Sequence, residues 1–260
     1  MDLRLTGKVA LVTGSSRGIG ASIAEGLAAE GCDVMLTGRD EAALKDVAAA
    51  LAKHGRKAQY STLDLSDPKA PAALVADTKK HFGKLDILVN NAGATKRGDF
   101  RELTDADWRD GFELKFFAHV RLAREAWPLL VASKGSIIGI AGIGGKEPEA
   151  EFGIGSSVNA ACMAWTKALA DVGKKEGVQV NCVNPGRVET ERLWRRIRGR
   201  VNDSSLSEAT VREEFQKEFN ITRFGLVEDI AGLIAFLASP HGRWMHSAII
   251  DMDGGEVRGV

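Results

Sequence analysis

The chain has 260 residues, with 44% hydrophobic and 27% charged side chains, which is the usage of an ordinary globular protein. A chain of this length can bury a large core without disulfide or metal staples, and it corresponds to one or two domains. Its 35 Lys and Arg balance 35 Asp and Glu, so a nucleic-acid-binding protein with a strongly basic field is not expected.

Short β-rich apolar runs alternate with longer helical patterns along the chain. Strands are predicted over residues 8–13, 33–37, 58–63, 85–89, 136–140, 178–183 and 248–250. Helices are predicted over residues 19–29, 41–53, 68–82, 105–131, 157–175 and 227–238. Strands that alternate with helices at this spacing form a parallel sheet with helices on both faces. We therefore expect an α/β fold, one doubly wound domain over residues 1–260 with a seven-stranded parallel sheet.

A glycine-rich turn, TGSSRGIG at residues 13–20, joins the first predicted strand to the first helix. Its glycines let the backbone approach a pyrophosphate, and the helix N-terminus offers unpaired N–H groups and a positive dipole. An ordinary strand-to-helix turn is the alternative. The position of the turn at the first junction of a doubly wound pattern favours dinucleotide binding.

Four motifs resemble those of the short-chain dehydrogenase/reductase family. They are the glycine-rich turn, NNAG at residues 90–93, NPGRVET at residues 184–190 and DMDGG at residues 251–255. The match runs over almost the whole chain, with the motifs in the family's order and spacing. The resemblance implies a Rossmann-type fold and an oxidoreductase that acts on a carbonyl or alcohol substrate.

Arg39 follows the second predicted strand, at a place where an acidic residue would bind the adenosine ribose and disfavour a 2′-phosphate. A guanidinium fork can instead take that phosphate. Arg17 lies on the same side, and the resemblance implies that basic residues at these two places prefer NADP(H), with NAD(H) also accepted. A solvated Arg39 paired with Asp40 is the alternative.

The resemblance assigns cofactor contacts to three further regions, which lie after the third, fourth and sixth predicted strands. They should contact the adenine, the ribose and the nicotinamide carboxamide, in that order. The predicted cofactor-binding residues are Gly14, Ser16, Arg17, Gly18, Ile19, Gly20, Arg39, Asp64, Leu65, Asn91, Ala92, Gly93, Pro185, Gly186, Val188 and Thr190.

Oxidoreductases of this family use an Asn, a Ser, a Tyr and a Lys for catalysis, and the aligned positions here hold Lys115, Gly142, Gly155 and Asn159. The single tyrosine of the chain, Tyr60, lies in the third predicted strand, near the adenine end of the cofactor. No shift of the alignment brings it to the reaction site. The resemblance therefore predicts a divergent member without the usual proton donor, whose loss typically costs about 10²–10⁴ in rate.

Lys115 is the first candidate for a replacement, because a desolvated lysine has a lowered pKa and its charge would replace the one missing at Asn159. Weaker candidates are the loop residues Lys146, Glu147, Glu149 and Glu151 and the following Ser156 and Ser157. Solvated loop side chains and a helix cap by one of the serines are the simpler interpretations. Glycines at 142, 144, 145, 153 and 155 predict a wide and mobile pocket.

The segment over about residues 190–224 is predicted to cover the substrate, and residues 187–200 hold six arginines. On a helix, Leu193, Trp194 and Ile197 would share an apolar face. The arginines could bind a carboxylate or the phosphates of an acyl-CoA. The alternative is a solvated helix paired with Glu189, Glu191 and the acidic residues 213–214. An anionic small-molecule substrate follows from the first interpretation.

The leading hypothesis is an NADP(H)-binding oxidoreductase with a rebuilt proton-transfer site. A catalytically inactive dinucleotide-binding protein, acting as a sensor or subunit partner, and a non-redox lyase or isomerase are the alternatives. The family usually forms homodimers or homotetramers through two long central helices, so a homo-oligomer is expected. No metal, nucleic-acid or membrane partner is expected, because the histidines lack ligand spacing and no apolar run reaches the length of a transmembrane helix. Three widely spaced cysteines and the lack of an apolar leader favour the cytoplasm.

Overall fold

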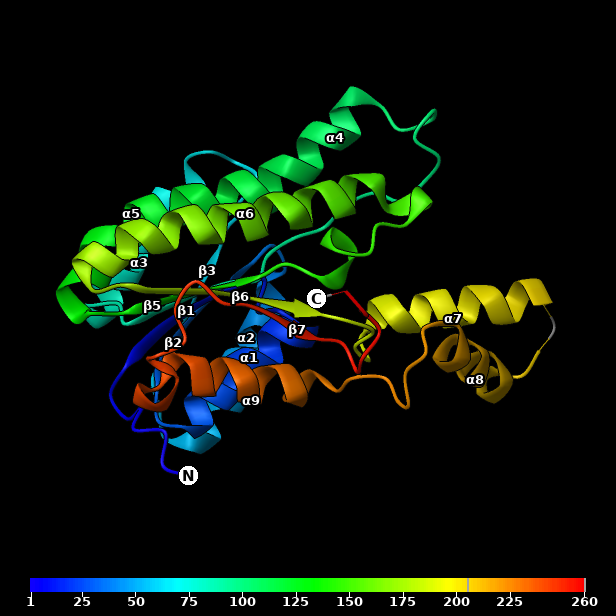
Figure 1. The fold of residues 1–260 in the computed structure, drawn as a ribbon. Helices are drawn as coiled ribbons and strands as arrows, with labels where there is room; N and C mark the ends of the chain where they lie inside the picture. The colour runs from blue at the N-terminus through cyan, green and yellow to red at the C-terminus, as the bar shows by residue number, and fades with distance from the viewer. Residues whose placement is uncertain (205, 260) are drawn as a thin grey trace.

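The computed structural model describes residues 1–204 and 206–259. Seven parallel strands form one sheet in the order β3-β2-β1-β4-β5-β6-β7 (Figure 1). They are β1 (Val9–Thr13), β2 (Asp33–Gly38), β3 (Ala58–Thr62), β4 (Ile87–Asn90), β5 (Ser136–Ile140), β6 (Gln179–Pro185) and β7 (Ile249–Met252). The predicted α/β fold and its seven-stranded parallel sheet are confirmed.

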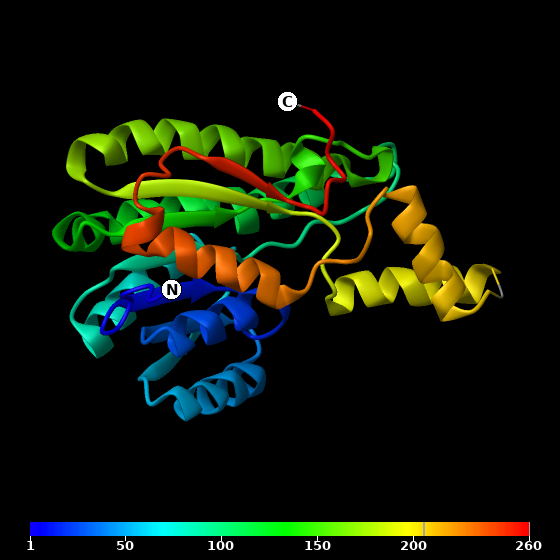
Figure 2. The ribbon, with the colours of Figure 1, turned by 60° about the horizontal axis from the view of Figure 1, so that its bottom comes forward.

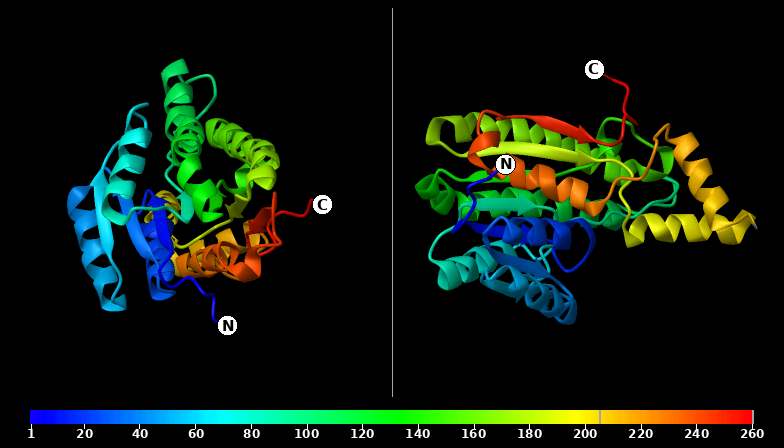
Figure 3. Two further views of the ribbon diagram at one scale, coloured as in Figure 1. Left: turned by 90° about the vertical axis from the view of Figure 1, so that its left-hand side faces the viewer. Right: turned by 90° about the horizontal axis from the view of Figure 1, so that it is seen from below.

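Helices cover both faces of this sheet, with α1, α2 and α9 on one face and α3, α5 and α6 on the other (Figures 1 and 3). The helices are α1 (Gly18–Ala29), α2 (Glu41–Leu51), α3 (Ala70–Phe82), α4 (Asp105–Phe112), α5 (Ala118–Ser133), α6 (Gly153–Glu176), α7 (Glu191–Ser204), α8 (Glu208–Glu218) and α9 (Val227–Ala238). Short helical turns are η1 (Ala52–His54), η2 (Glu113–Phe117), η3 (Ile143–Gly145), η4 (Ala150–Phe152) and η5 (Pro240–Gly242).

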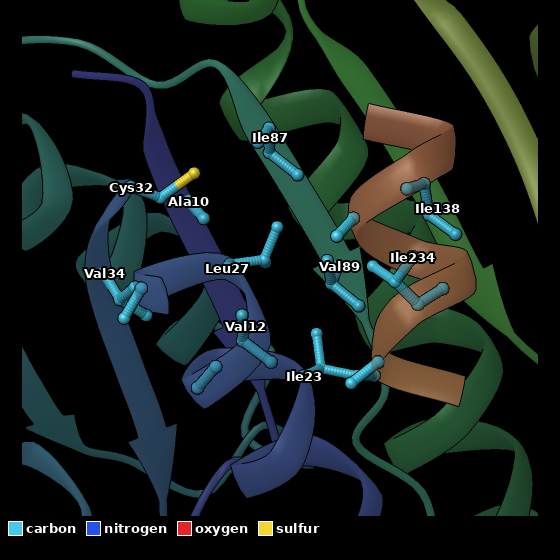
Figure 4. Close-up of a cluster of buried hydrophobic side chains, with 14 of the residues drawn as sticks. Ala10, Val12, Ile23, Leu27, Cys32, Val34, Ile87, Val89, Ile138 and Ile234 are labelled. Atoms are coloured by element: carbon cyan, nitrogen blue, oxygen red, sulfur yellow. The ribbon is translucent and has the colours of Figure 1, made fainter. Parts of the chain in front are cut away.

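The central strands are buried on both faces, as a doubly covered parallel sheet requires. On β1, Ala10 and Val12 pack with Ile23 and Leu27 of α1 and with Ile234 of α9 (Figure 4). The alternate residues of the same strand belong to the second core cluster, against α3, α5 and α6. This alternation explains why the strands read as almost continuous apolar runs in the sequence.

The strand order reverses between β1 and β4, and ligands of open α/β sheets bind at such a switch point, beyond the carboxyl ends of the strands. Thr13 ends β1, and its Oγ1 accepts hydrogen bonds from the backbone N–H groups of Asn91 and Ala92, both at 2.9 Å. The fold thus fixes the glycine-rich turn beside the NNAG segment.

Two predicted helices differ from the structure in a way that shapes the site. The helix predicted over residues 105–131 contains one π-helical turn, η2, between α4 and α5. The helix predicted to begin at residue 157 already begins at Gly153, so neither Ser156 nor Ser157 caps it. Ile154 is fully buried in this first turn, and its packing offsets the low helix propensity of the glycines around it.

The segment predicted to cover the substrate forms two helices, α7 and α8, which project from the body of the protein (Figure 2). Leu193 and Ile197 of α7 pack against Val211 and Phe215 of α8, which gives the pair a small core of its own. The segment around residues 193–197 is helical, the condition under which its apolar residues were expected to share a face, whereas α8 was not predicted. In the described part of the chain, no helix has the length and apolarity needed to cross a membrane.

Candidate active site

The N-terminus of α1 is open to an anion. Arg17 occupies the position before the helix in an extended conformation, and no described side chain caps the first-turn N–H groups. The first turn also holds no acidic residue. Gly14 and Gly18 adopt positive φ values of 63° and 58°, which residues with a Cβ rarely adopt. Free N–H groups and a positive dipole at a glycine turn suit a pyrophosphate.

Hydrogen bonds from Asn91 and close packing at Gly20 fix the conformation of this glycine-rich turn. The Asn91 side-chain amide donates hydrogen bonds to the carbonyl oxygens of Thr13 at 2.8 Å and Gly14 at 3.1 Å. A Cβ on Gly20 would lie 2.2 Å from the Gly14 oxygen and 2.5 Å from the Asn91 Nδ2. The Asn91 side chain therefore stabilises the turn. Contact between Asn91 and the cofactor ribose remains a prediction.

Gly20→Ala is expected to destabilise the protein by about 1–3 kcal/mol, because the new methyl group overlaps the backbone of the turn. It should also weaken dinucleotide binding. The matched control is Gly232→Ala, at an exposed position of α9 with open space around the added Cβ. That variant should gain about 0.5–1 kcal/mol. Urea unfolding measures both, and equal midpoints for the two variants would contradict the expected crowding.

An exposed arginine follows β2, at the end of the site that is predicted to bind the adenosine. Arg39 Nη1 lies 3.8 Å from an Asp64 carboxylate oxygen, and the Arg39 side chain is 68% exposed. Asp40 instead accepts a hydrogen bond from the Ala43 N–H at 3.1 Å and caps α2. The alternative pairing of Arg39 with Asp40 is therefore wrong. Hydrogen bonds from Ser66, and after them the charge of Arg39, lower the pKa of Asp64.

At the other end of the crevice, two of the aligned catalytic positions touch. Lys115 comes from the π-helical turn η2, and its Nζ donates to the Ala141 carbonyl at 2.8 Å and to Asn159 Oδ1 at 2.7 Å. Its aliphatic stem crosses Gly93, where a Cβ would lie 2.8 Å from Lys115 Cδ. A π-helical turn re-aims the side chains of a helix and is common at functional sites. The missing side chain of Gly93 lets the lysine reach the end of β5.

The Lys115 ammonium has no carboxylate to balance it. Both of its acceptors are neutral, and no described acidic residue lies within 4 Å of it. Desolvation lowers its pKa to about 8, and the charge of Arg192 acts in the same direction. Desolvation and the charge of Lys115 lower the pKa of His119 to about 3, so this histidine is neutral. Desolvation also raises the pKa of the Cys162 thiol to about 11, so it stays protonated at neutral pH.

The other two aligned positions lie beside this pair. Gly142 has a φ of 152°, and a Cβ there would lie 3.1 Å from Asn159 Nδ2. A Cβ on Gly155 would lie 2.1 Å from the Phe152 ring, so this ring occupies the space of a side chain at position 155. The remaining cavity has a volume of about 10 Å³, room for about one water. The predicted wide pocket is therefore wrong, because Phe152 fills it.

The loop residues that the sequence offered as weaker candidates are solvated or engaged elsewhere. Lys146 Nζ lies 2.6 Å from an Asp251 carboxylate oxygen. Glu149 accepts hydrogen bonds from Arg97 and from Arg187, the latter at 2.9 Å. Glu147 and Glu151 are exposed. Among residues 1–204 and 206–259, no three His, Cys, Asp or Glu side chains form a group that would hold a metal ion.

Sequence reasoning missed Phe152 and did not single out Arg192, although both line the cavity beside Lys115. Phe152 precedes Gly155 by three residues. Residues at this spacing on a helix are neighbours, so the sequence could have indicated that Phe152 lies beside Gly155. Tyr60 lies on β3, at the edge of the sheet, with β2 and β1 between it and β4. The tyrosine is therefore remote from Lys115, as the sequence predicted.

Comparison with known proteins gives a consistent result. A model of the family described as short chain dehydrogenase matches residues 8–200. The chain is 33% identical to the L-sorbose reductase of Gluconobacter frateurii, whose structure is complexed with NADPH and L-sorbose, with 100% of both chains covered and a TM-score of 0.97. A short chain dehydrogenase of Burkholderia cenocepacia in complex with NADP is 32% identical, with 97% and 99% covered and a TM-score of 0.85. The 3-oxoacyl-[acyl-carrier-protein] reductase of Salmonella typhimurium is 30% identical, with 96% and 97% covered.

Proposed function

The chain belongs to the short chain dehydrogenase family, and on that premise we propose that it is an NADP(H)-dependent oxidoreductase that interconverts a carbonyl group and an alcohol. Two similar structures hold NADPH or NADP, and the similar proteins named above include two reductases. The proton-transfer site is proposed to be non-standard, with Lys115 as the proton donor. The observation that carries this proposal is the Lys115 ammonium held at the end of β5.

The described residues fit a dinucleotide with a 2′-phosphate. The uncapped N-terminus of α1 suits the pyrophosphate, and the exposed Arg17 and Arg39 suit the additional phosphate. Thr190 packs near this turn, since a Cβ on Gly18 would lie 3.7 Å from its Cγ2. When bound, the cofactor supplies or accepts the hydride. The rest of the site supplies the proton and holds the substrate.

Lys115 has one N–H group free to donate a proton into the cavity. An ammonium has three N–H donors. Two of them are used by the Ala141 carbonyl and Asn159 Oδ1, and the side chain also lines the cavity, which leaves the third for a substrate oxygen. A pKa of about 8 places the group near neutral pH, where a general acid or base works best.

A catalytically inactive dinucleotide-binding protein is the second candidate, and the Phe152 ring favours it. The ring occupies the space next to Gly155 and leaves a cavity of about 10 Å³. An active enzyme needs this ring or the exposed Arg192 to move when substrate binds. No observation favours a non-redox lyase or isomerase, because Glu149 is held by two arginines and no described loop carboxylate lines the cavity.

A titration of tryptophan fluorescence with NADPH and NADH, followed by a panel of carbonyl substrates, tests the proposal. Tight binding with turnover supports the oxidoreductase, tight binding without any turnover supports the inactive binder, and a protein that binds neither cofactor contradicts both.

Arg39→Ala is expected to raise the Kd for NADPH by about 10- to 100-fold and to leave the Kd for NADH nearly unchanged. The lost interaction is a charge-assisted hydrogen bond to the 2′-phosphate, worth about 1.5–3 kcal/mol. Arg124→Ala, at an exposed position of α5, removes the same charge elsewhere and should change neither value. Parallel loss of both affinities in Arg39→Ala would point to a folding defect instead of phosphate recognition.

We also propose that the chain forms a homodimer or homotetramer through α5 and α6. These long helices lie on the same face of the sheet (Figure 3). Phe117, at the end of η2 next to α5, and Val172 of α6 are 43% and 45% exposed, and these apolar side chains support the proposal. Sedimentation velocity of the full chain measures the state directly.

A further inference from the structure

The wall of the cavity beside Lys115 includes two cationic side chains and, among the described residues, no carboxylate. Its lining residues are Gly93, Ala94, Thr95, Lys115, Phe152, Gly155, Asn159 and Arg192. The remaining lining is apolar or neutral, so the charge of the two cations is not cancelled within the wall.

Arg192 reaches this wall from the first turn of α7. Its side chain is exposed, and its Nη2 donates to the Gly93 carbonyl at 3.4 Å. Gly93 is the residue that the stem of Lys115 crosses, so the guanidinium and the lysine meet on the same short segment. No described carboxylate lies within 4 Å of Arg192. The fork of the guanidinium is therefore open on its solvent side.

Two other arginines, Arg97 and Arg187, already have carboxylate partners. Arg97 and Arg187 share Glu149, and Arg187 also binds Glu256 at 2.7 Å. Because these acids are engaged, they do not neutralise Arg192.

We infer that the substrate is a short oxo acid, or in the reverse direction the matching hydroxy acid, with its carboxylate bound by Arg192 and its carbonyl oxygen facing Lys115. The inference rests on the proposed function and specifies its substrate class. The anion expected from the arginine-rich segment is thereby assigned to Arg192, at the mouth of the cavity, and not to the exposed Arg195.

The atoms and electrons of the proposed reaction balance when the cofactor supplies the hydride and Lys115 supplies the proton. In the direction of reduction, the carbonyl carbon gains a hydride from NADPH, its oxygen gains a proton from Lys115, and the π bond of the carbonyl becomes a C–H and an O–H bond. NADPH leaves as NADP⁺, and water returns a proton to Lys115. The carboxylate is unchanged and serves to bind and orient the substrate.

Geometry limits the substrate to a compact molecule. Lys115 and Arg192 line the same cavity and both lie against Gly93, so a substrate that reaches both has its carboxylate and its carbonyl separated by only a few carbon atoms. An arginine binds a carboxylate through two parallel N–H···O bonds, which a lysine does not reproduce. A neutral ester of the same oxo acid lacks the negative charge that Arg192 would bind.

The test compares pyruvate, 2-oxobutyrate, acetoacetate and levulinate with their methyl esters. For at least one pair, kcat/KM is expected to be about 10- to 100-fold higher for the acid. Arg192→Gln should raise KM for the acid by about the same factor and leave the ester unaffected. Arg192→Lys should recover only part of the loss. Arg195→Gln is the matched control, because it removes a neighbouring exposed charge from the same helix and should change neither substrate.

A binding measurement separates this inference from the proposed function. Calorimetry with pyruvate and with its amide, in the absence of cofactor, should show weaker binding of the anion to Arg192→Gln than to the unaltered protein. Equal turnover of acids and esters with no effect of Arg192→Gln overturns the inference and leaves the oxidoreductase intact. A protein that turns over no carbonyl but loses pyruvate binding in Arg192→Gln retains the anion site and loses the proposed activity.

Discussion

Lys115→Met is expected to slow carbonyl reduction in a single turnover by about 10²- to 10⁴-fold, the usual cost of removing a general acid. Methionine keeps an unbranched stem across Gly93 and removes the ammonium that contacts Asn159 and the end of β5. Lys167→Met is the control, because Lys167 is an exposed residue whose Nζ bonds to the Ser247 carbonyl, away from the cavity. An unchanged rate in Lys115→Met would remove the lysine from the mechanism.

The pH dependence gives this prediction a second readout. Reduction needs the protonated lysine, so kcat/KM should be flat at low pH and fall tenfold per pH unit above about 8. Oxidation needs the neutral amine, so its kcat/KM should rise with pH and level off above about 8. Both breaks should be absent in Lys115→Met. The nearby His119 does not produce them, because its pKa is lowered to about 3.

The sheet and the glycine-rich turn were predictable because local physics determines them. Buried strands such as β2 and β4 are apolar at consecutive positions, over residues 34–36 and 87–89, and this pattern requires helices on both faces. The glycine-rich turn carries its own signal, since Gly14 and Gly18 need positive φ and Gly20 needs contact with backbone. No long-range information was needed for these elements.

The candidate reaction site was only partly predictable, because its geometry depends on contacts between distant segments. Alignment placed Lys115 and Asn159 at two positions of one site, but their direct contact depends on the π-helical turn that carries the lysine. The helix α6 begins four residues before its predicted start because burial of Ile154 outweighs glycine propensity. That early start places the Phe152 ring over Gly155. The ring fills the pocket that the glycines were predicted to leave open.

Asn159→Asp is expected to move the break in the reduction profile upward from about 8. The exchange keeps the shape of the side chain and places a carboxylate oxygen where Oδ1 lies, 2.7 Å from Lys115 Nζ. An opposite charge at this distance raises the pKa of a lysine by about 1–3. The side-chain groups that face the ammonium in the unaltered protein are neutral apart from Arg192, so nothing else would cancel the new charge.

The sign of the effect differs between the two reaction directions, and this difference makes the variant diagnostic. A raised pKa keeps Lys115 protonated to higher pH, so reduction should persist above pH 8 where the unaltered protein loses it. Oxidation at neutral pH should fall by about 10- to 1000-fold, because the neutral amine becomes scarcer by the same factor. The added charge should also weaken binding of an oxo acid, since the cavity wall then holds a carboxylate.

Asn202→Asp, on the exposed face of α7, adds one negative charge outside the cavity and should leave both profiles in place. A break that stays near 8 in Asn159→Asp, in a protein that unfolds at the usual urea concentration, would show that another group titrates. A break that moves upward only in Asn159→Asp requires a cation next to position 159. Lys115 is the cation that the structure places there, because its ammonium is the group bonded to Asn159.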